Sequence, residues 1–231
     1  MCSLEKRGNL FVLTLTGDGA DEHRLDSALI SSIRTALLDA KVHSTHGSVF
    51  ITVANGKFFS NGLALDPASS PSTSILELSE VYRSMLADFV SLPMPTISVV
   101  TGHAVGGGLG LAICHDYVFM SRGHGVLWMN EVHTGMLIPD FGIELLRSKV
   151  MKAGSLRDIL LRGVKVKADE AVTMGLVDVA CDSRESAVEG GFRMGVELAK
   201  MKWDGEFYAK MRKSLYPNLC SKLGLGYKAR L

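Results

Sequence analysis

The sequence has almost no net charge and no long apolar run, and each absence removes a class of protein. The formal net charge of the 231 residues is +1, so the chain lacks the basic field that attracts nucleic acid or membrane surfaces. No apolar stretch reaches the length of a membrane span. Residues 1–9 lack the apolar stretch of a signal peptide. We therefore expect neither a nucleic-acid partner nor a membrane span.

Cysteines are also few, and their spacing argues against a metal site. They lie at Cys2, Cys114, Cys181 and Cys220, without a CxxC pair or any metal-ligand spacing. We expect no bound metal and interpret the four residues as reduced, mostly buried thiols in an intracellular compartment.

The composition that remains is typical of a soluble globular protein, with 47% hydrophobic and 21% charged residues. A chain of this length can form one domain with a full core. We predict a single domain over residues 1–231, with a core to about residue 180 and a helical C-terminal region from about 181 to 231.

Local patterns predict an α/β fold, with strands mainly in the first half and helices mainly in the second. Runs of β-branched and aromatic residues predict strands at 10–16, 48–53, 96–100, 117–120 and 126–128. Apolar residues at helical spacing predict helices at 24–41, 75–89, 143–151, 156–161, 168–174, 186–201 and 206–215. A polar loop is expected at 67–74, and a glycine-rich bend at 102–110 that leads into a short helix.

Three segments could carry chemistry, and the first is FFSNGLALD at residues 58–66. Gly62 permits a backbone conformation that other residues resist, which would free the next amide to point into space. Taken alone, however, the segment is better explained as an ordinary strand-to-helix turn.

The second segment, ISVVTGHAVGGGLG at residues 97–110, runs from a buried strand through three glycines into a helix. Amides in the first turn of a helix lack internal partners and lie at its positive end, so they suit negative charge developing on an oxygen. The phosphate-binding pattern GxxxxGK[ST] and the dinucleotide pattern GxGxxG are both missing.

The third segment, VLWMNEVHTGMLIPD at residues 126–140, places Glu131 after an apolar stretch. Burial would raise the pKa of this carboxyl group and make it a better base. A structural carboxylate in a turn is the alternative. His103 and His133 lie near these motifs, and we interpret both as structural polar groups.

Together and in this order, the three segments resemble the crotonase (enoyl-CoA hydratase/isomerase) superfamily. The resemblance covers nearly the whole chain. It implies a spiral of ββα units, and trimers or pairs of trimers. It also implies an oxyanion hole, formed by the amides of Leu63 and Gly107, for the thioester oxygen of an acyl-CoA. Coenzyme A would be part of the substrate, with no separate cofactor. The residues expected to line the substrate site are Ser60, Asn61, Gly62, Ala64, Leu65, Gly106, Gly108 and Gly110.

The loss of one acid favours a particular member of this family. Its hydratases use two glutamates, one of which matches Glu131, while the other falls at Gly110. A single base suffices to move a double bond, so we predict a Δ3,Δ2-enoyl-CoA isomerase that converts 3-enoyl-CoA to 2-trans-enoyl-CoA. Gly110 is expected to leave room for the acyl chain.

Two alternatives stay open. The first is a dienoyl-CoA isomerase or another acyl-CoA enzyme that uses Asp140, since dienoyl-CoA isomerases of the family use a second carboxylate in this neighbourhood. We favour Asp140 as a helix cap. A non-catalytic acyl-CoA-binding homologue would have the same fold. Lys210, Arg212 and Lys213 could meet the phosphates of coenzyme A, but a solvated basic face is the preferred interpretation.

The C-terminal tripeptide Ala229-Arg230-Leu231 resembles the S-K-L type of peroxisomal address. It predicts recognition by the peroxisomal import receptor. A peroxisome is a compartment in which unsaturated fatty acids are oxidised, so this expectation agrees with the predicted chemistry.

Overall fold

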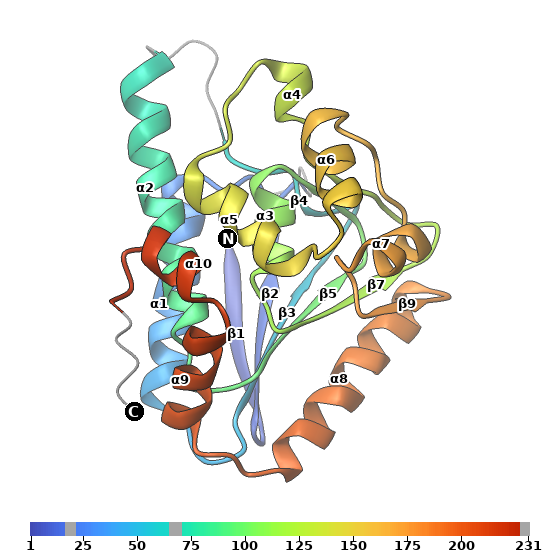
Figure 1. Ribbon diagram of the computed structural model, residues 1–231. Helices are drawn as coiled ribbons and strands as arrows, with labels where there is room; N and C mark the ends of the chain where they lie inside the picture. Colours follow the sequence, from blue (N-terminus) through green and yellow to red (C-terminus); the bar gives the residue numbers. More distant parts are fainter. Residues whose placement is uncertain (17–21, 65–70, 227–231) are drawn as a thin grey trace.

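The computed structural model describes residues 1–16, 22–64 and 71–226, and its main feature is a six-stranded sheet (Figure 1). The strand order is β1-β2-β3-β5-β7-β9. The β1 strand pairs with β2 in antiparallel orientation, and all the other neighbours are parallel. The bounds are Cys2–Arg7 for β1, Leu10–Leu15 for β2, Val49–Ala54 for β3, Thr96–Val100 for β5, Tyr117–Ser121 for β7 and Val179–Cys181 for β9.

A second, three-stranded parallel sheet determines where the site forms. It contains β4 (Phe58–Ser60), β6 (His103–Val105) and β8 (Leu127–Trp128). Successive strands alternate between the two sheets, and each pair is followed by a helix: α2 (Pro71–Val90), α3 (Gly107–Ile113) or α4 (Glu131–Thr134). This confirms the spiral of ββα units. Because the small sheet is parallel, the turns that follow its three strands lie at the same edge.

Helices cover both faces of the large sheet. The α1 helix (Ser27–Val42) and α2 lie on one side, and α8 (Arg184–Lys200) crosses the other (Figure 1). Glycines bring α8 close to the strands, since a Cβ at Gly191 would lie 2.6 Å from Val99 Cγ2 and one at Gly195 would lie 2.9 Å from Ile51 Cδ1. Part of the glycine content of the chain therefore serves helix-on-sheet packing.

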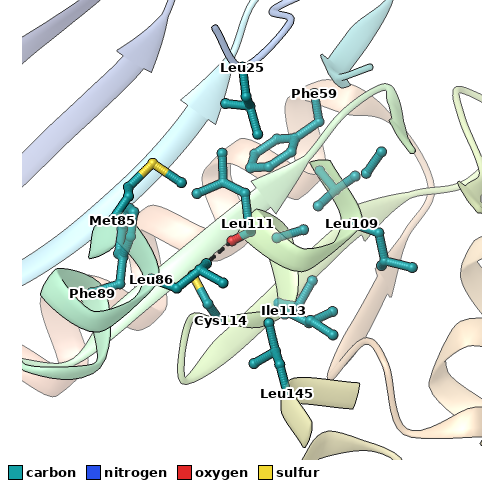
Figure 2. Close-up of a cluster of buried hydrophobic side chains, with 14 of the residues drawn as sticks. Leu25, Phe59, Met85, Leu86, Phe89, Leu109, Leu111, Ile113, Cys114 and Leu145 are labelled. Carbon is teal, nitrogen blue, oxygen red and sulfur yellow. Dashed lines mark hydrogen bonds between the residues drawn. The ribbon is translucent and has the colours of Figure 1, made fainter. Parts of the chain in front are cut away.

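The α3 helix is held in place by apolar side chains (Figure 2). Leu109, Leu111 and Ile113 of α3 are almost fully buried, and they join a cluster that includes Phe89 of α2 and Leu145 of α5 (Asp140–Lys149). Burial of each such side chain contributes about 1.5–3 kcal/mol. The first turn of α3, which carries the glycine triplet, therefore has a rigid support.

The remaining helices are α6 (Ala153–Leu161), α7 (Ala168–Met174), α9 (Gly205–Leu215) and α10 (Pro217–Lys222). Among the described residues, no helix combines the length and apolarity needed to cross a membrane. Cys114 and Cys220 are buried, whereas Cys2 and Cys181 are only partly buried, so the expectation of mostly buried thiols was half right.

Several elements were missing from the sequence-based prediction. The strands β4, β6 and β9 have only three residues each, too few to show alternation, and β1 is a largely exposed edge strand. The α10 helix was also missed. The predicted loop at 67–74 was wrong from residue 71 onward, where α2 begins, and residues 67–70 lie outside the described part.

The predicted basic face on α9 was wrong for Arg212, which is 5% exposed. Its Nε donates to Asp116 Oδ1 at 2.7 Å, and its other nitrogens donate to the carbonyls of Leu92 and Met94. Burial by itself would raise the pKa of Asp116, but the attraction of Arg212 outweighs burial and lowers that pKa. Lys210 is exposed, as expected. The ion pair fastens α9 to the residue that precedes β7, and the bonds to Leu92 and Met94 fasten it to the segment between α2 and β5.

We expect Arg212→Met to lower the free energy of unfolding by about 3–5 kcal/mol, because Asp116 would then be buried without an opposite charge. Urea denaturation followed by circular dichroism measures this loss. Lys210→Met is the matched control and should change stability by about 0.5 kcal/mol or less. Equal stability of the two variants would show that the buried ion pair contributes nothing.

Candidate active site

Two glycine turns approach each other at the edge of the small sheet. Gly62 follows β4 with a φ of +79°, and Gly106 follows β6 with a φ of +51°. Both values lie in the left-handed region that favours glycine. A Cβ at Gly62 would also lie only 2.8 Å from the carbonyl oxygen of Val105. No larger residue could bring these turns so close together.

The approach places the amides of Leu63 and Gly107 side by side. A Cβ at Gly62 would lie 3.4 Å from Gly107 N, and one at Gly107 would lie 3.6 Å from Leu63 N. Neighbouring groups of the 62–64 turn are paired, since Gly62 O accepts from Leu25 N at 2.8 Å and Ala64 N donates to Leu25 O at 3.1 Å. Within the described residues, neither the Leu63 nor the Gly107 amide donates to an acceptor. Two free main-chain donors therefore meet at one place.

Glu131 begins α4, directly after the third strand of the small sheet. Its Oε1 lies against the glycine turn, 2.9 Å from the position that a Cβ at Gly106 would take. Its Oε2 is buried and has no hydrogen-bond partner among the described residues. Burial raises the pKa of Glu131, although main-chain hydrogen bonds from Asn130 and Glu131 itself act in the opposite direction. The Oε2 atom of such a carboxylate can still accept a proton.

One pocket contains all three groups. Leu63, Gly107 and Glu131 line it, together with Gly106 and Gly110. Most of the remaining wall is apolar and comes from α2, α5 and the segments before α4 and α5: Leu86, Met129, Ile138, Phe141, Leu145 and Leu146. A few polar groups in an apolar cleft are typical of a small-molecule site. A wider groove of about 410 Å³ lies between α1 and α2, and it is not lined by Leu63, Gly107 or Glu131.

Other predicted site residues support the turns instead of lining this pocket. Ser60 is fully buried, and its Oγ donates to His23 O at 2.7 Å. Asn61 Nδ2 donates to Glu22 Oε2 at 3.2 Å. A Cβ at Gly108 would overlap Ser60 O, so this glycine lets α3 pack on β4. Leu65 lies outside the described residues.

Gly110 lines the pocket, and its role in leaving room for an acyl chain stays a prediction. A Cβ at Gly110 would overlap the hydroxyl oxygen of Tyr82, which comes from α2 and lines the same pocket. Tyr82 falls in the helix predicted at 75–89, but no local pattern in the sequence indicated where its hydroxyl would lie.

Asp140 and the two histidines lie away from the pocket wall. The prediction of Asp140 as a helix cap was wrong, because Pro139 takes the cap position and Asp140 is the first residue of α5. The carboxylate of Asp140 is 82% exposed and accepts from Lys222 Nζ at 2.8 Å. His103 stacks beside Phe58, while a ring nitrogen of His133 lies 3.3 Å from the carbonyl oxygen of Gly163.

Comparisons with known proteins identify a matching family and related sequences. The family model described as enoyl-CoA hydratase/isomerase matches residues 10–215. Enoyl-CoA delta isomerase 2, peroxisomal, of Arabidopsis thaliana is 48% identical over 97% of this chain and 96% of its own length. Enoyl-CoA delta isomerase 1, peroxisomal, of the same plant is 45% identical over 93% of this chain and 89% of its own length.

Solved structures show the same fold. The apo structure of an enoyl-CoA isomerase from Mycobacterium tuberculosis superposes with a TM-score of 0.85, covering 96% of this chain and 94% of that one at 19% identity. An enoyl-CoA hydratase/isomerase family protein from Pseudomonas syringae gives a TM-score of 0.86 at 21% identity, covering 96% and 93% of the two chains. Because the family model spans most of the sequence and the plant relatives match over nearly their full length, the chain belongs to the enoyl-CoA hydratase/isomerase family.

Proposed function

We propose that the protein is a Δ3,Δ2-enoyl-CoA isomerase of unsaturated fatty acid oxidation, in which Glu131 is the single acid/base. The observation that carries this proposal is one pocket that combines the Leu63 and Gly107 amides, which have no acceptor among the described residues, with a half-buried carboxylate whose Oε2 has no partner there. The delta isomerase names of the Arabidopsis relatives support the same activity.

The proposed reaction uses each group once. The thioester carbonyl of a 3-enoyl-CoA makes its C2 hydrogens acidic, and the Leu63 and Gly107 amides stabilise the oxygen of the enolate as it forms. Glu131 takes a proton from C2 and returns it at C4, which moves the double bond from position 3 to position 2. Proton and charge balance within the substrate and Glu131, so we propose that no cofactor is needed beyond the coenzyme A of the substrate.

Asp140 does not suit the role of a second catalytic carboxylate. Its side chain is exposed, is bound to Lys222 and does not line the pocket. The geometry therefore favours the isomerase with one acid over the dienoyl-CoA isomerase.

The compartment is the peroxisome, in agreement with the names of two plant relatives. We propose that the import receptor reads Ala229, Arg230 and Leu231, which lie outside the described residues. We also propose a homo-trimer or homo-hexamer. In support, large apolar side chains are exposed near α4 and α6, with Leu137 97%, Met151 91% and Leu161 71% accessible in the single chain.

Glu131→Gln is expected to lower kcat for 3-enoyl-CoA roughly 100-fold or more with little change in KM, because the amide keeps the shape but cannot accept the proton. Formation of the conjugated thioester, followed by absorbance, measures the rate. Glu144→Gln on α5, outside the pocket, is the control and should retain activity. Near-normal turnover by Glu131→Gln would remove the assignment of the base.

The same assay tests how kcat/KM depends on pH. The base must be ionised, and the pKa of Glu131 is raised above its usual value of 4.5. For the normal enzyme, kcat/KM should therefore fall as pH decreases through this raised pKa, and the residual activity of Glu131→Gln should lack that step.

Gly106→Ala tests whether the glycine turn positions Glu131. The new methyl group would lie 2.9 Å from Glu131 Oε1, and a displaced base should lower kcat about 10- to 100-fold. Gly123→Ala is the matched control, because Gly123 also has a positive φ but nothing lies within 4 Å of its Cβ position. Both residues have a positive φ, so equal activity of the two variants would show that contact with Glu131 is unimportant.

Deletion of residues 229–231 should move an N-terminally tagged protein from peroxisomes to the cytosol, as seen by fluorescence microscopy. Arg230→Lys keeps the positive charge and should keep the peroxisomal location. The activity of the purified truncated enzyme should be unchanged. Retention of the truncated protein in peroxisomes would show that another segment directs import.

A further inference from the structure

The helical backbone of α3 does not require glycine at position 110. It lies inside α3, where its amide donates to Gly106 O at 3.1 Å and its carbonyl accepts from Cys114 N at 3.0 Å. Its φ is not in the left-handed region. At such a position glycine is about 1 kcal/mol less favourable than alanine. The reason for glycine must therefore be space, and the group that occupies this space is the hydroxyl of Tyr82.

Tyr82 is held in this position by contacts on three sides. It is 5% exposed, and its ring lies 6.2 Å from the ring of Phe141 between centroids. Its Oη donates to Gly107 O at 2.6 Å, so the proposed oxyanion residue is bound through its carbonyl while its amide stays free. Burial, and after it the nearby Cys114 and Glu131, raise the pKa of Tyr82 well above 10, so the group remains a neutral donor.

This hydroxyl also occupies the space of a side chain at position 110, where the hydratases of the family have their second glutamate. Hydration of 2-enoyl-CoA requires a water oxygen to bond to C3 while C2 gains a proton, and a second group must accept the proton that the water loses. The pocket holds one carboxylate, Glu131, among its described residues. The hydroxyl of Tyr82 already donates its hydrogen bond to Gly107 O and occupies the volume beside Gly110.

We propose that Tyr82 is a positioning and specificity-determining residue of the isomerase, which fixes Gly107 and keeps water out of the volume above Gly110. This inference rests on the proposed function. It assigns to α2 a part in the choice between moving the double bond and adding water. Gly110 and Tyr82 then form a matched pair: because Gly110 has no side chain, the hydroxyl of Tyr82 can reach Gly107 in the oxyanion turn.

The test uses four proteins: the normal enzyme, Tyr82→Phe, Gly110→Ala and the double variant. Gly110→Ala alone must displace the hydroxyl from Gly107 and should lower kcat about 10- to 100-fold. In the double variant the methyl group lies 3.5 Å from the ring carbon that carried the hydroxyl, an ordinary contact. The double variant should therefore recover most of the activity that Gly110→Ala loses.

Tyr82→Phe should lower kcat about 3- to 10-fold, the size of one lost hydrogen bond, with little change in KM. The decisive readout is the ratio of 3-hydroxyacyl-CoA to 2-enoyl-CoA, measured by chromatography of the products. Tyr82→Phe opens a space about the size of one water, so this ratio should rise. The double variant fills that space with a methyl group, so its ratio should fall back toward that of the normal enzyme.

The controls distinguish a failure of the proposed isomerase activity from a failure of the role assigned to Tyr82. If the normal enzyme does not isomerise 3-enoyl-CoA, the proposed function fails. If it does, an unchanged product ratio in Tyr82→Phe, or a double variant no more active than Gly110→Ala, overturns the role of Tyr82. Circular dichroism and thermal unfolding show that each variant is folded. Should Gly110→Ala fail to fold, the product ratios of Tyr82→Phe and the double variant still decide the question.

Discussion

The whole site depends on the close approach of two main-chain turns at the edge of the small sheet. The carbonyl of Val105 lies so near Gly62 that any side chain at position 62 would collide with it. This approach brings the Leu63 and Gly107 amides together without a hydrogen-bonding partner among the described residues. Free donors in a nearly apolar pocket are costly to leave unpaired, so the arrangement suits a ligand oxygen.

The alternation of strands between two sheets makes this approach possible. Three strands of the large sheet, β3, β5 and β7, are each followed by a short strand of the small sheet, so turns about 25–45 residues apart in the sequence end at a common edge. The buried α3 helix then holds the second turn rigid (Figure 2). Precise placement of donors matters for catalysis because a preorganised site needs no reorganisation as charge develops.

Two carboxylates show how the surroundings decide a role. Asp116 is buried beside Arg212, and the ion pair lowers its pKa and holds the C-terminal helices on the core. Glu131 is half-buried, no cation of the described residues shifts its pKa, and burial raises that pKa. The first group is a structural anion over the whole range of physiological pH. The second is the group to which we assign the proton exchange with the substrate.

The sequence by itself determined the fold family, the two glycine corners and Glu131, because glycine runs and a strand-to-turn acid are local patterns with a recognisable spacing. It also indicated most of the longer helices and strands, whose apolar periodicity is repeated over several turns. It could not show that Ser60 and Gly108 pack against each other, or that Arg212 is buried. Only the tertiary structure decided that the hydroxyl of Tyr82 stands in the space of the missing side chain of Gly110. Contacts between residues far apart in the chain leave no local periodicity, so they become visible only when the elements that carry them are packed together.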